Sequence, residues 1–352
     1  MVFFDAARVL IPFVISFAVG IGGAPVLTHY LYKHKVWKKK TGKNALDGKL
    51  ASEFNKLHQE REGYTPRMGG ILIWGSVLIT AILIAFCGLF NESLARLDFV
   101  NRGQTWLPIF ALLSGAIVGF ANDVLDVVTH DARGISLRYR LIAVAIISGV
   151  AGWWFYAKLG VMGVGVPFLG VIPLGIFFIA FFIFVALVLY ASGVIDGIDG
   201  LAGGVFAIIF MAYAGIAFAQ NQVALAGFAA TVAGALFAFL WFNVPPARFW
   251  MTETGTMALT LALTVTAFSA DSLGDGVGVS VLPIIAFPLF ATVASNALQI
   301  FWKKVFKKKL FRIAPIHHHF EAIGWPSYKV VMRYWIVTII AGMFGVAVAL
   351  LK

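Results

Sequence analysis

The feature that most constrains this chain is a succession of long apolar stretches separated by loops that hold most of the charges. About 20 apolar residues in a row are enough for an α-helix to cross the hydrocarbon core of a bilayer. Such stretches lie at roughly 9–32, 70–90, 105–122, 141–157, 171–190, 201–219, 223–243, 255–270, 280–301 and 329–351. A soluble domain has too little interior for this composition, since 61% of the 352 residues are hydrophobic and 12% are charged. The sequence predicts an all-α, polytopic membrane protein of about ten transmembrane helices, with residues 1–352 forming one integral membrane domain.

The basic residues predict how the helices are oriented. Of the 27 Lys and Arg residues, ten lie in Lys33–Arg67, three in Arg133–Arg140 and eight in Lys303–Arg333. The positive-inside rule places these segments in the cytoplasm, and an even number of spans then puts both termini on the extracytoplasmic side. The net charge of +11 is thus attributed to membrane orientation, and no nucleic-acid partner is expected. The first basic loop contains a predicted interfacial helix, whose lysines are expected to contact anionic membrane lipids and whose apolar stripe is Leu46, Leu50, Phe54 and Leu57.

Carboxylates gather on the side predicted to be cytoplasmic. They are Asp123, Asp126, Asp196, Asp199, Glu253 and Glu321. The first two are three residues apart, hence on one helical face, and Asp196 and Asp199 are each followed by Gly in a predicted tight turn. Helix-end charges, turn aspartates and, for Glu253, helix capping are the structural alternatives. Together with neighbouring Lys, Arg and His residues, such a cluster at a membrane boundary suggests Mg²⁺ bound with phosphate or pyrophosphate.

Three consecutive histidines lie in the segment Ala314–Glu321, between a basic run and the last apolar stretch. Successive side chains on a helix point about 100° apart, so a helix would turn one of the three away from any common ligand. Pro315 also favours an irregular backbone. We therefore predict a loop here, with a basic interfacial loop of no catalytic role as the alternative.

At these residues the chain resembles a known family. The matching segments are Thr65–Gly70, Asp196–Ala202, Phe239–Asn243, and Ala314–Glu321 followed by Gly324-Trp325-Pro326. They are similar to the phospho-N-acetylmuramoyl-pentapeptide transferases, which belong to the polyprenyl-phosphate N-acetylhexosamine-1-phosphate transferase superfamily. The resemblance implies transfer of phospho-MurNAc-pentapeptide from its UDP carrier to undecaprenyl phosphate, giving lipid I and UMP for peptidoglycan synthesis. It also implies Mg²⁺ as cofactor, the bacterial inner membrane as location, an active site on the cytoplasmic face and a homodimer.

The resemblance assigns roles to individual residues. The catalytic residues it implies are Asp123, Asp196, His317, His318 and His319. Those implied to bind substrate are Thr65, Arg67, Asn122, Arg133, Asp199 and Trp250, the last by stacking on uracil. The metal ligands implied or inferred are Asp123, Asp126 and Glu253. Three of these positions depart from the family pattern, since Asn122 replaces an aspartate, Asp126 a lysine and Glu253 an aspartate.

Other functions remain to be separated from this one. The departures motivate a related transferase with another UDP-sugar donor, or a homologue that binds nucleotide or lipid without turnover. A transporter is disfavoured because transport sites usually lie near the bilayer midplane, whereas this chain collects its ionisable groups at one face.

Overall fold

The computed structural model describes residues 2–37, 63–100, 103–129, 134–272 and 276–351. Arg133 and the predicted interfacial helix at 46–57 lie outside these ranges. Ten long helices form the described part: α1 Val2–Lys33, α3 Gly70–Gly88, α5 Trp106–Val128, α6 Leu137–Lys158, α7 Phe177–Ser192, α8 Leu201–Ala219, α9 Val223–Asn243, α10 Thr252–Ser272, α12 Phe287–Phe306 and α14 Ser327–Leu350. Each corresponds to one predicted apolar stretch, so the predicted fold class is confirmed.

The remaining elements are short. They are α4 Glu92–Ala95, η1 Gly193–Ile195, α11 Leu282–Ile285, α13 Ile316–Ala322, and strands β1 Gly163–Val166 and β2 Gly170–Pro173. The strands form an antiparallel hairpin in which Gly163 pairs with Pro173. The prediction that a helix begins at 171 is therefore wrong. The Gly-rich sequence there forms two paired strands joined by a turn at residues 167–169, and α7 begins only at Phe177.

Eight of the described helices are long and apolar enough to span a membrane, which makes this a multi-pass membrane protein. The two long helices that fall short are α10 and α12, of 21 and 20 residues. Helix α10 contains six threonines, yet nearly all of its described side chains are buried. Several of these hydroxyls donate to a carbonyl one turn earlier, as Thr264 does to Thr260 at 2.8 Å. The threonine hydroxyls of α10 are thus satisfied inside the protein.

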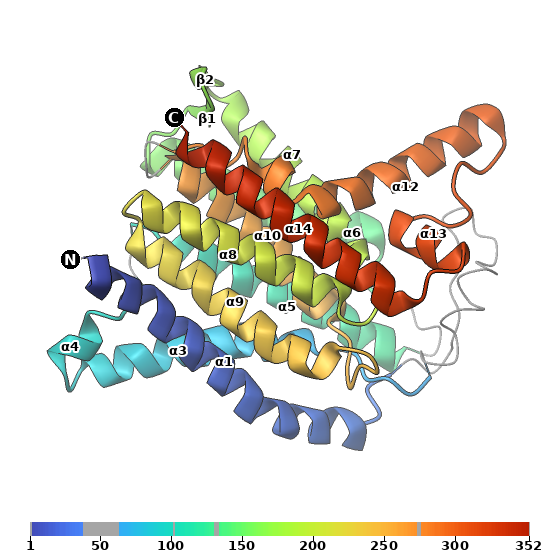
Figure 1. Cartoon of the computed structure of the whole chain (residues 1–352), viewed down its shortest axis with the longest axis horizontal. Helices are drawn as coiled ribbons and strands as arrows, with labels where there is room; N and C mark the ends of the chain where they lie inside the picture. The colour runs from blue at the N-terminus through green and yellow to red at the C-terminus, as the bar shows by residue number, and fades with distance from the viewer. Residues whose placement is uncertain (1, 38–62, 101–102, 130–133, 273–275, 352) are drawn as a thin grey trace.

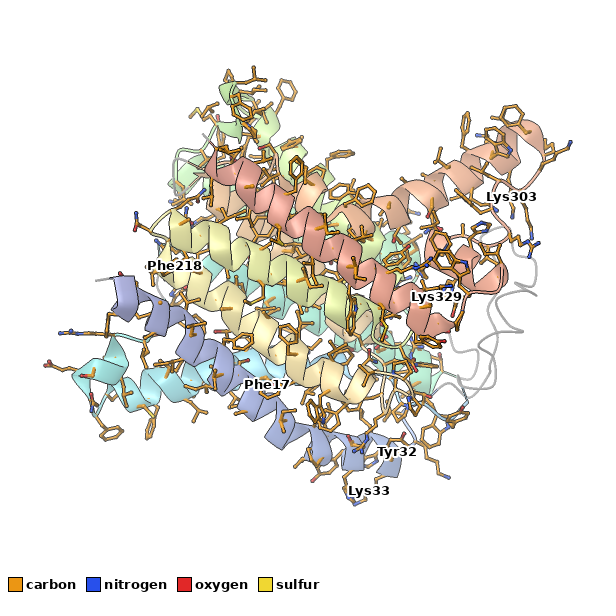
Figure 2. The ribbon with its side chains drawn as sticks, viewed as in Figure 1. Phe17, Tyr32, Lys33, Phe218, Lys303 and Lys329 are labelled. Carbon is orange, nitrogen blue, oxygen red and sulfur yellow. The ribbon has the colours of Figure 1, made fainter. Side chains whose placement is uncertain are left out.

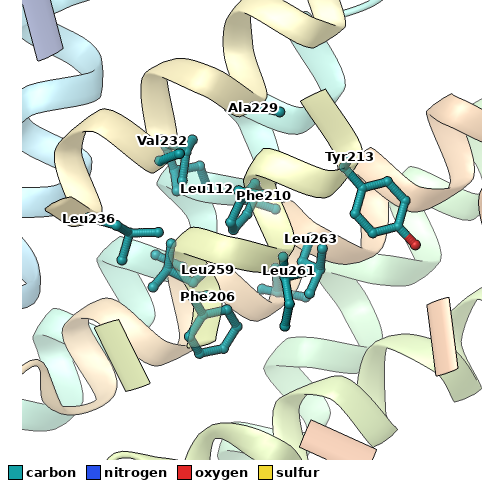
Figure 3. Packing of buried hydrophobic residues seen from close by; sticks show 14 of the residues in the cluster. Leu112, Phe206, Phe210, Tyr213, Ala229, Val232, Leu236, Leu259, Leu261 and Leu263 are labelled. Carbon is teal, nitrogen blue, oxygen red and sulfur yellow. The ribbon is translucent and has the colours of Figure 1, made fainter. Parts of the chain in front are cut away.

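The core lies where α8, α9 and α10 meet, and the outer helices pack around it (Figure 1). Helix α1 runs along α9, α5 along α10, and α14 along α8. Figure 3 shows the interlocking side chains of this core, among them Leu112 of α5, Phe206 and Phe210 of α8, Val232 of α9 and Leu259 of α10. Both termini lie at one end of the bundle, and α13 lies at the other (Figure 1).

Two glycines bring three helices together at the end where α10 begins. A Cβ atom at Gly70 of α3 would collide with the backbone of Gly255, and one at Gly119 of α5 with the carbonyl of Glu253. Small residues at helix interfaces allow such close backbone approach. As a result, the first turn of α10 is held between α3 and α5.

Candidate active site

Thr252, the first residue of α10, joins two of the predicted catalytic carboxylates. Its hydroxyl donates to Oδ2 of Asp123 at 2.5 Å, and its backbone N–H donates to Oδ2 of Asp196 at 2.8 Å. Thr254 adds two more bonds to Asp123 Oδ2, from its N–H at 2.8 Å and its hydroxyl at 2.6 Å. Asp123 is completely buried, so these donors replace the water that would otherwise solvate its charge. Segments more than 50 residues apart in sequence thus converge on one threonine.

Arg67 lies between the two carboxylates of α5. Its Nη2 atom is 3.1 Å from Asp126 Oδ2 and 3.6 Å from Asp123 Oδ1. The backbone around it is fixed, because the Arg67 N–H donates to the carbonyl of Val36 at 2.7 Å. The N–H of Met68, the next residue, donates to the Thr252 hydroxyl at 3.1 Å. The predicted substrate-binding arginine therefore pairs with both carboxylates of this helix face and offsets part of their charge.

A second arginine, Arg140 in the first turn of α6, forms an ion pair with Glu253. Tyr190 of α7 lies close to both partners. Sequence reasoning missed Arg140, which it counted only as one of the basic residues that set membrane orientation. The available signal was its position at the start of a span, in a segment predicted to lie on the same side as Glu253.

Asp199 organises the loop that precedes α10. One carboxylate oxygen accepts from the indole N–H of Trp250 and the other from the N–H of Ala247, each at 3.0 Å. Asn243 supports the same loop by donating to the carbonyl of Phe249 and by accepting from the N–H of Gly200, each at 2.9 Å. The predicted uracil-stacking residue is thus held against the aspartate turn by its ring nitrogen.

The three histidines lie in a helix, α13, and the prediction of a loop is wrong. Pro315 precedes the helix as its N-cap residue, where the missing N–H costs no helical hydrogen bond. The helix separates the side chains as its geometry requires. His317 and His318 both lie with Nε2 close to Gly197 of the aspartate turn, where an added Cβ atom would be 3.0 Å from His317 Nε2 and would collide with His318 Nε2. His319 instead accepts a hydrogen bond from the Arg312 N–H at 3.2 Å.

His318 is oriented by buried polar partners. Its Nδ1 lies 2.8 Å from Oε2 of Glu321, whose Oε1 accepts from the hydroxyl of Ser327 at 2.6 Å. A carboxylate at Nδ1 holds the proton there and fixes the orientation of the ring. Nε2 is thereby directed at the turn that carries Asp196.

The other predicted binding residues have structural partners. Asn122 accepts from the N–H of Ile135 at 2.9 Å and donates to Oδ1 of Asp123 at 3.3 Å. It therefore connects the end of α5 to the segment that leads into α6. Thr65 is buried just before Arg67.

The described residues do not fit the predicted magnesium site. Asp123 and Asp126 face Arg67, and Glu253 faces Arg140, so each proposed ligand already has a guanidinium partner. Within the described ranges, no group of three His, Cys, Asp or Glu side chains is arranged to hold a metal ion. The carboxylates come together as predicted, but each of them faces an arginine.

An apolar pocket of about 340 Å³ lies between α12, α13 and α14. Ile316 and Phe320 of α13 line it, whereas His317 and His318 of the same helix face Gly197. Its lining includes Phe287, Ile316, Phe320, Trp325, Arg333 and Tyr334. Phe320 stacks on Trp325 with ring centroids 4.7 Å apart, and the Arg333 guanidinium lies 4.1 Å from the Trp325 centroid.

Lysines lie at the same end of the molecule as this pocket. Figure 2 shows Lys33, Lys303 and Lys329 toward this end and Phe218 at the opposite end. Helix α13 thus separates an apolar pocket from the charged site.

Comparison with known proteins gives consistent results. Residues 105–271 match the model of glycosyl transferase family 4. The chain is 30% identical to a phospho-N-acetylmuramoyl-pentapeptide-transferase of Caldanaerobacter subterraneus subsp. tengcongensis, over 95% of this chain and 96% of the relative. It is 31% identical to one of Clostridium perfringens over 95% and 96% of the two chains, and 34% identical to one of Granulibacter bethesdensis over 82% and 80%.

Proposed function

The chain belongs to the phospho-N-acetylmuramoyl-pentapeptide transferases, and from that premise we propose a location for the reaction. It transfers phospho-MurNAc-pentapeptide from UDP-MurNAc-pentapeptide to undecaprenyl phosphate, giving lipid I and UMP for peptidoglycan synthesis. We propose that the reaction occurs where α5, α10, α13 and the aspartate turn meet, at the cytoplasmic face of the bacterial inner membrane. Both termini would then lie outside, and the whole chain would act as one membrane domain, paired as a homodimer.

The observation that carries this proposal is the convergence of distant motifs. Thr252 binds Asp123 and Asp196 at the same time, and Gly197 lies against His317 and His318. Acid and imidazole groups from three separate segments, joined by Thr252 from a fourth, therefore share one small region. Such convergence is expected of a site that must hold two phosphorylated reactants in a defined orientation.

We place the donor nucleotide against Trp250 and Arg67. Trp250 is held by Asp199 and leaves its ring partly exposed, which supports stacking on uracil. Arg67 is positioned to donate to the diphosphate, because guanidinium groups match phosphate oxygens in geometry and charge.

We place the lipid acceptor in the pocket between α12 and α14. Its apolar lining suits a polyprenyl chain, while Arg333 and Lys329 beside Trp325 offer positive charge to the lipid phosphate. His317 connects the two regions, since its ring lies 6.3 Å from that of Tyr334 in the pocket wall. The acceptor phosphate would reach the charged site around α13.

In the proposed reaction an oxygen of the lipid phosphate bonds to the sugar-linked phosphorus. The bond from that phosphorus to the bridging oxygen breaks, and UMP leaves with that oxygen. The lipid phosphate needs little deprotonation, since the second pKa of such a group is about 6. His318, with Nε2 directed at the turn, would donate to or accept from the reacting phosphates, and Glu321 would hold it in place. We assign no step to magnesium, because the carboxylates predicted to bind it face arginines.

The direct test is UMP release from UDP-MurNAc-pentapeptide by the purified protein in detergent with undecaprenyl phosphate. We expect release only when both substrates are present, and a strong loss of release with Asp123→Asn. UDP-GlcNAc in place of the muramyl donor is the control for substrate class. No UMP from well-folded protein would refute the proposal, and faster release from UDP-GlcNAc would indicate a different transferase of the same superfamily.

A further inference from the structure

We propose that Arg67 and Arg140 together replace a divalent cation at this site and bind the donor diphosphate directly, so that nucleotide diphosphate binding requires no magnesium. The inference depends on the proposed function for the identity of the ligand as a nucleoside diphosphate. It concerns binding and can be measured independently of group transfer.

The two guanidinium groups are only partly engaged. Arg67 contacts Asp123 and Asp126 through Nη2, and Arg140 contacts Glu253 through Nη1. Among the described residues, the buried Nε atoms of both arginines have no hydrogen-bond partner. Oε2 of Glu253 is also buried without one, so the Arg140–Glu253 pair is not the two-point contact that these groups can form. The Nε atoms themselves are buried, but the side chains of Arg67 and Arg140 are 14% and 20% exposed, and guanidinium donors are suited to phosphate oxygens.

The hydrogen bonds of Asp123 leave little room for a metal ion. Its Oδ2 already accepts three hydrogen bonds, from Thr252 and Thr254, although a carboxylate oxygen has only about two lone pairs. Its Oδ1 accepts from Asn122 and lies near Arg67. Magnesium requires oxygen ligands at about 2.0–2.1 Å in nearly octahedral geometry, which these groups cannot provide while their present partners remain.

The charges also match. Two guanidinium groups carry the same formal charge as one Mg²⁺ ion, and they lie beside the carboxylates that would otherwise hold it. Arg67 and Arg140 therefore offset part of the repulsion between the carboxylates and a bound diphosphate. A direct bond from either arginine also restricts the position of the diphosphate, as a charge-assisted hydrogen bond does.

The experiment is a calorimetric titration of the purified protein with UDP, in EDTA and in magnesium. We expect the dissociation constant to differ by less than about threefold between the two conditions. In EDTA, Arg67→Gln and Arg140→Gln should each weaken UDP binding by about 10- to 100-fold, the effect of losing one charged hydrogen-bond donor. Arg8→Gln is the matched control and should bind UDP like the wild type, because Arg8 pairs with Asp5 near the chain terminus.

A second measurement removes the dependence on nucleotide. Mn²⁺ alone should not raise the unfolding temperature of the wild type, whereas it should stabilise Arg67→Gln, in which Asp123 and Asp126 lose their cation. If Arg67→Gln does not fold, Arg140→Gln gives the same test at Glu253. Strong UDP binding that disappears in EDTA, or tight Mn²⁺ binding by the wild type, would overturn the inference and leave the proposed function intact. Absence of UDP binding in both conditions would also overturn the inference, while UMP release from the muramyl donor decides the proposed function separately.

Discussion

The strongest single test of the site is replacement of Thr252 by valine. Valine has the shape of threonine without the hydroxyl, so the variant removes the bond to Asp123 and leaves the buried N–H of Met68 without an acceptor. Thr252 also has a positive φ of 55°, unfavourable for a β-branched residue, and valine retains that backbone cost. An unsatisfied buried donor and a lost bond to a charged group together cost about 2–5 kcal/mol.

Both stability and turnover should change. The unfolding temperature should fall by about 3–7 °C for a loss of this size in a chain of 352 residues. UMP release should fall by about 100-fold, because Asp123 and the aspartate turn lose their common support. The control is Thr252→Ser, which keeps the hydroxyl and both hydrogen bonds and should lie close to the wild type in both assays. Equal behaviour of the valine and serine variants would show that the hydroxyl does not organise the site.

Further predictions concern the histidine helix and the donor loop. His318→Ala should reduce UMP release by about 100-fold or more. Glu321→Gln should reduce it by a smaller factor, since glutamine keeps the shape of glutamate but loses the charge that orients the His318 ring. Equal rates for Glu321→Gln and the wild type would contradict the role of Glu321 in orienting His318. Gly197→Ala should lower turnover with little change in UDP affinity, because the added methyl group collides with His318 Nε2. An unchanged rate would mean that α13 and the aspartate turn can move apart without loss of turnover. Asp199→Ala should weaken UDP binding in a titration by about tenfold, because the Trp250 indole N–H loses its acceptor, and undiminished affinity would remove Trp250 from the proposed uracil site.

The helices could be predicted because their signal is local. Each apolar run is long enough to identify itself, and the first and last residues of α3, α8 and α9 fall within two residues of the expected limits. The β-hairpin before α7 was missed because its residues are as apolar as those of a span. Composition alone does not distinguish paired strands from helix in such a sequence.

The residues of the candidate site could be predicted from the sequence, but the ion pairs between them could not. Asp123, Asp196 and His318 were found from motifs, and the structure brings them together through Thr252 and Gly197. The pairing of Arg140 with Glu253 joins residues 113 positions apart, and no local pattern specifies it.

The prediction of a magnesium site also lacked the information about which distant side chains pair with the carboxylates. Carboxylates at one face of a membrane require a positive partner, but sequence does not say whether that partner is an ion or an arginine. Only the packing of α6 against α10 identifies Arg140 as a partner, and only the packing of the segment before α3 against α5 identifies Arg67.

The internally satisfied threonines of α10 have a consequence for mapping topology. A hydropathy criterion passes over α10 and also over α12. If both helices cross the membrane, the termini are still assigned to the same side, because the two omitted crossings cancel, whereas the segment between these helices, including Ser280, is assigned to the opposite side. A cysteine introduced at Ser280 and labelled with a membrane-impermeant reagent from each side would therefore report the true number of crossings when labels at the termini do not.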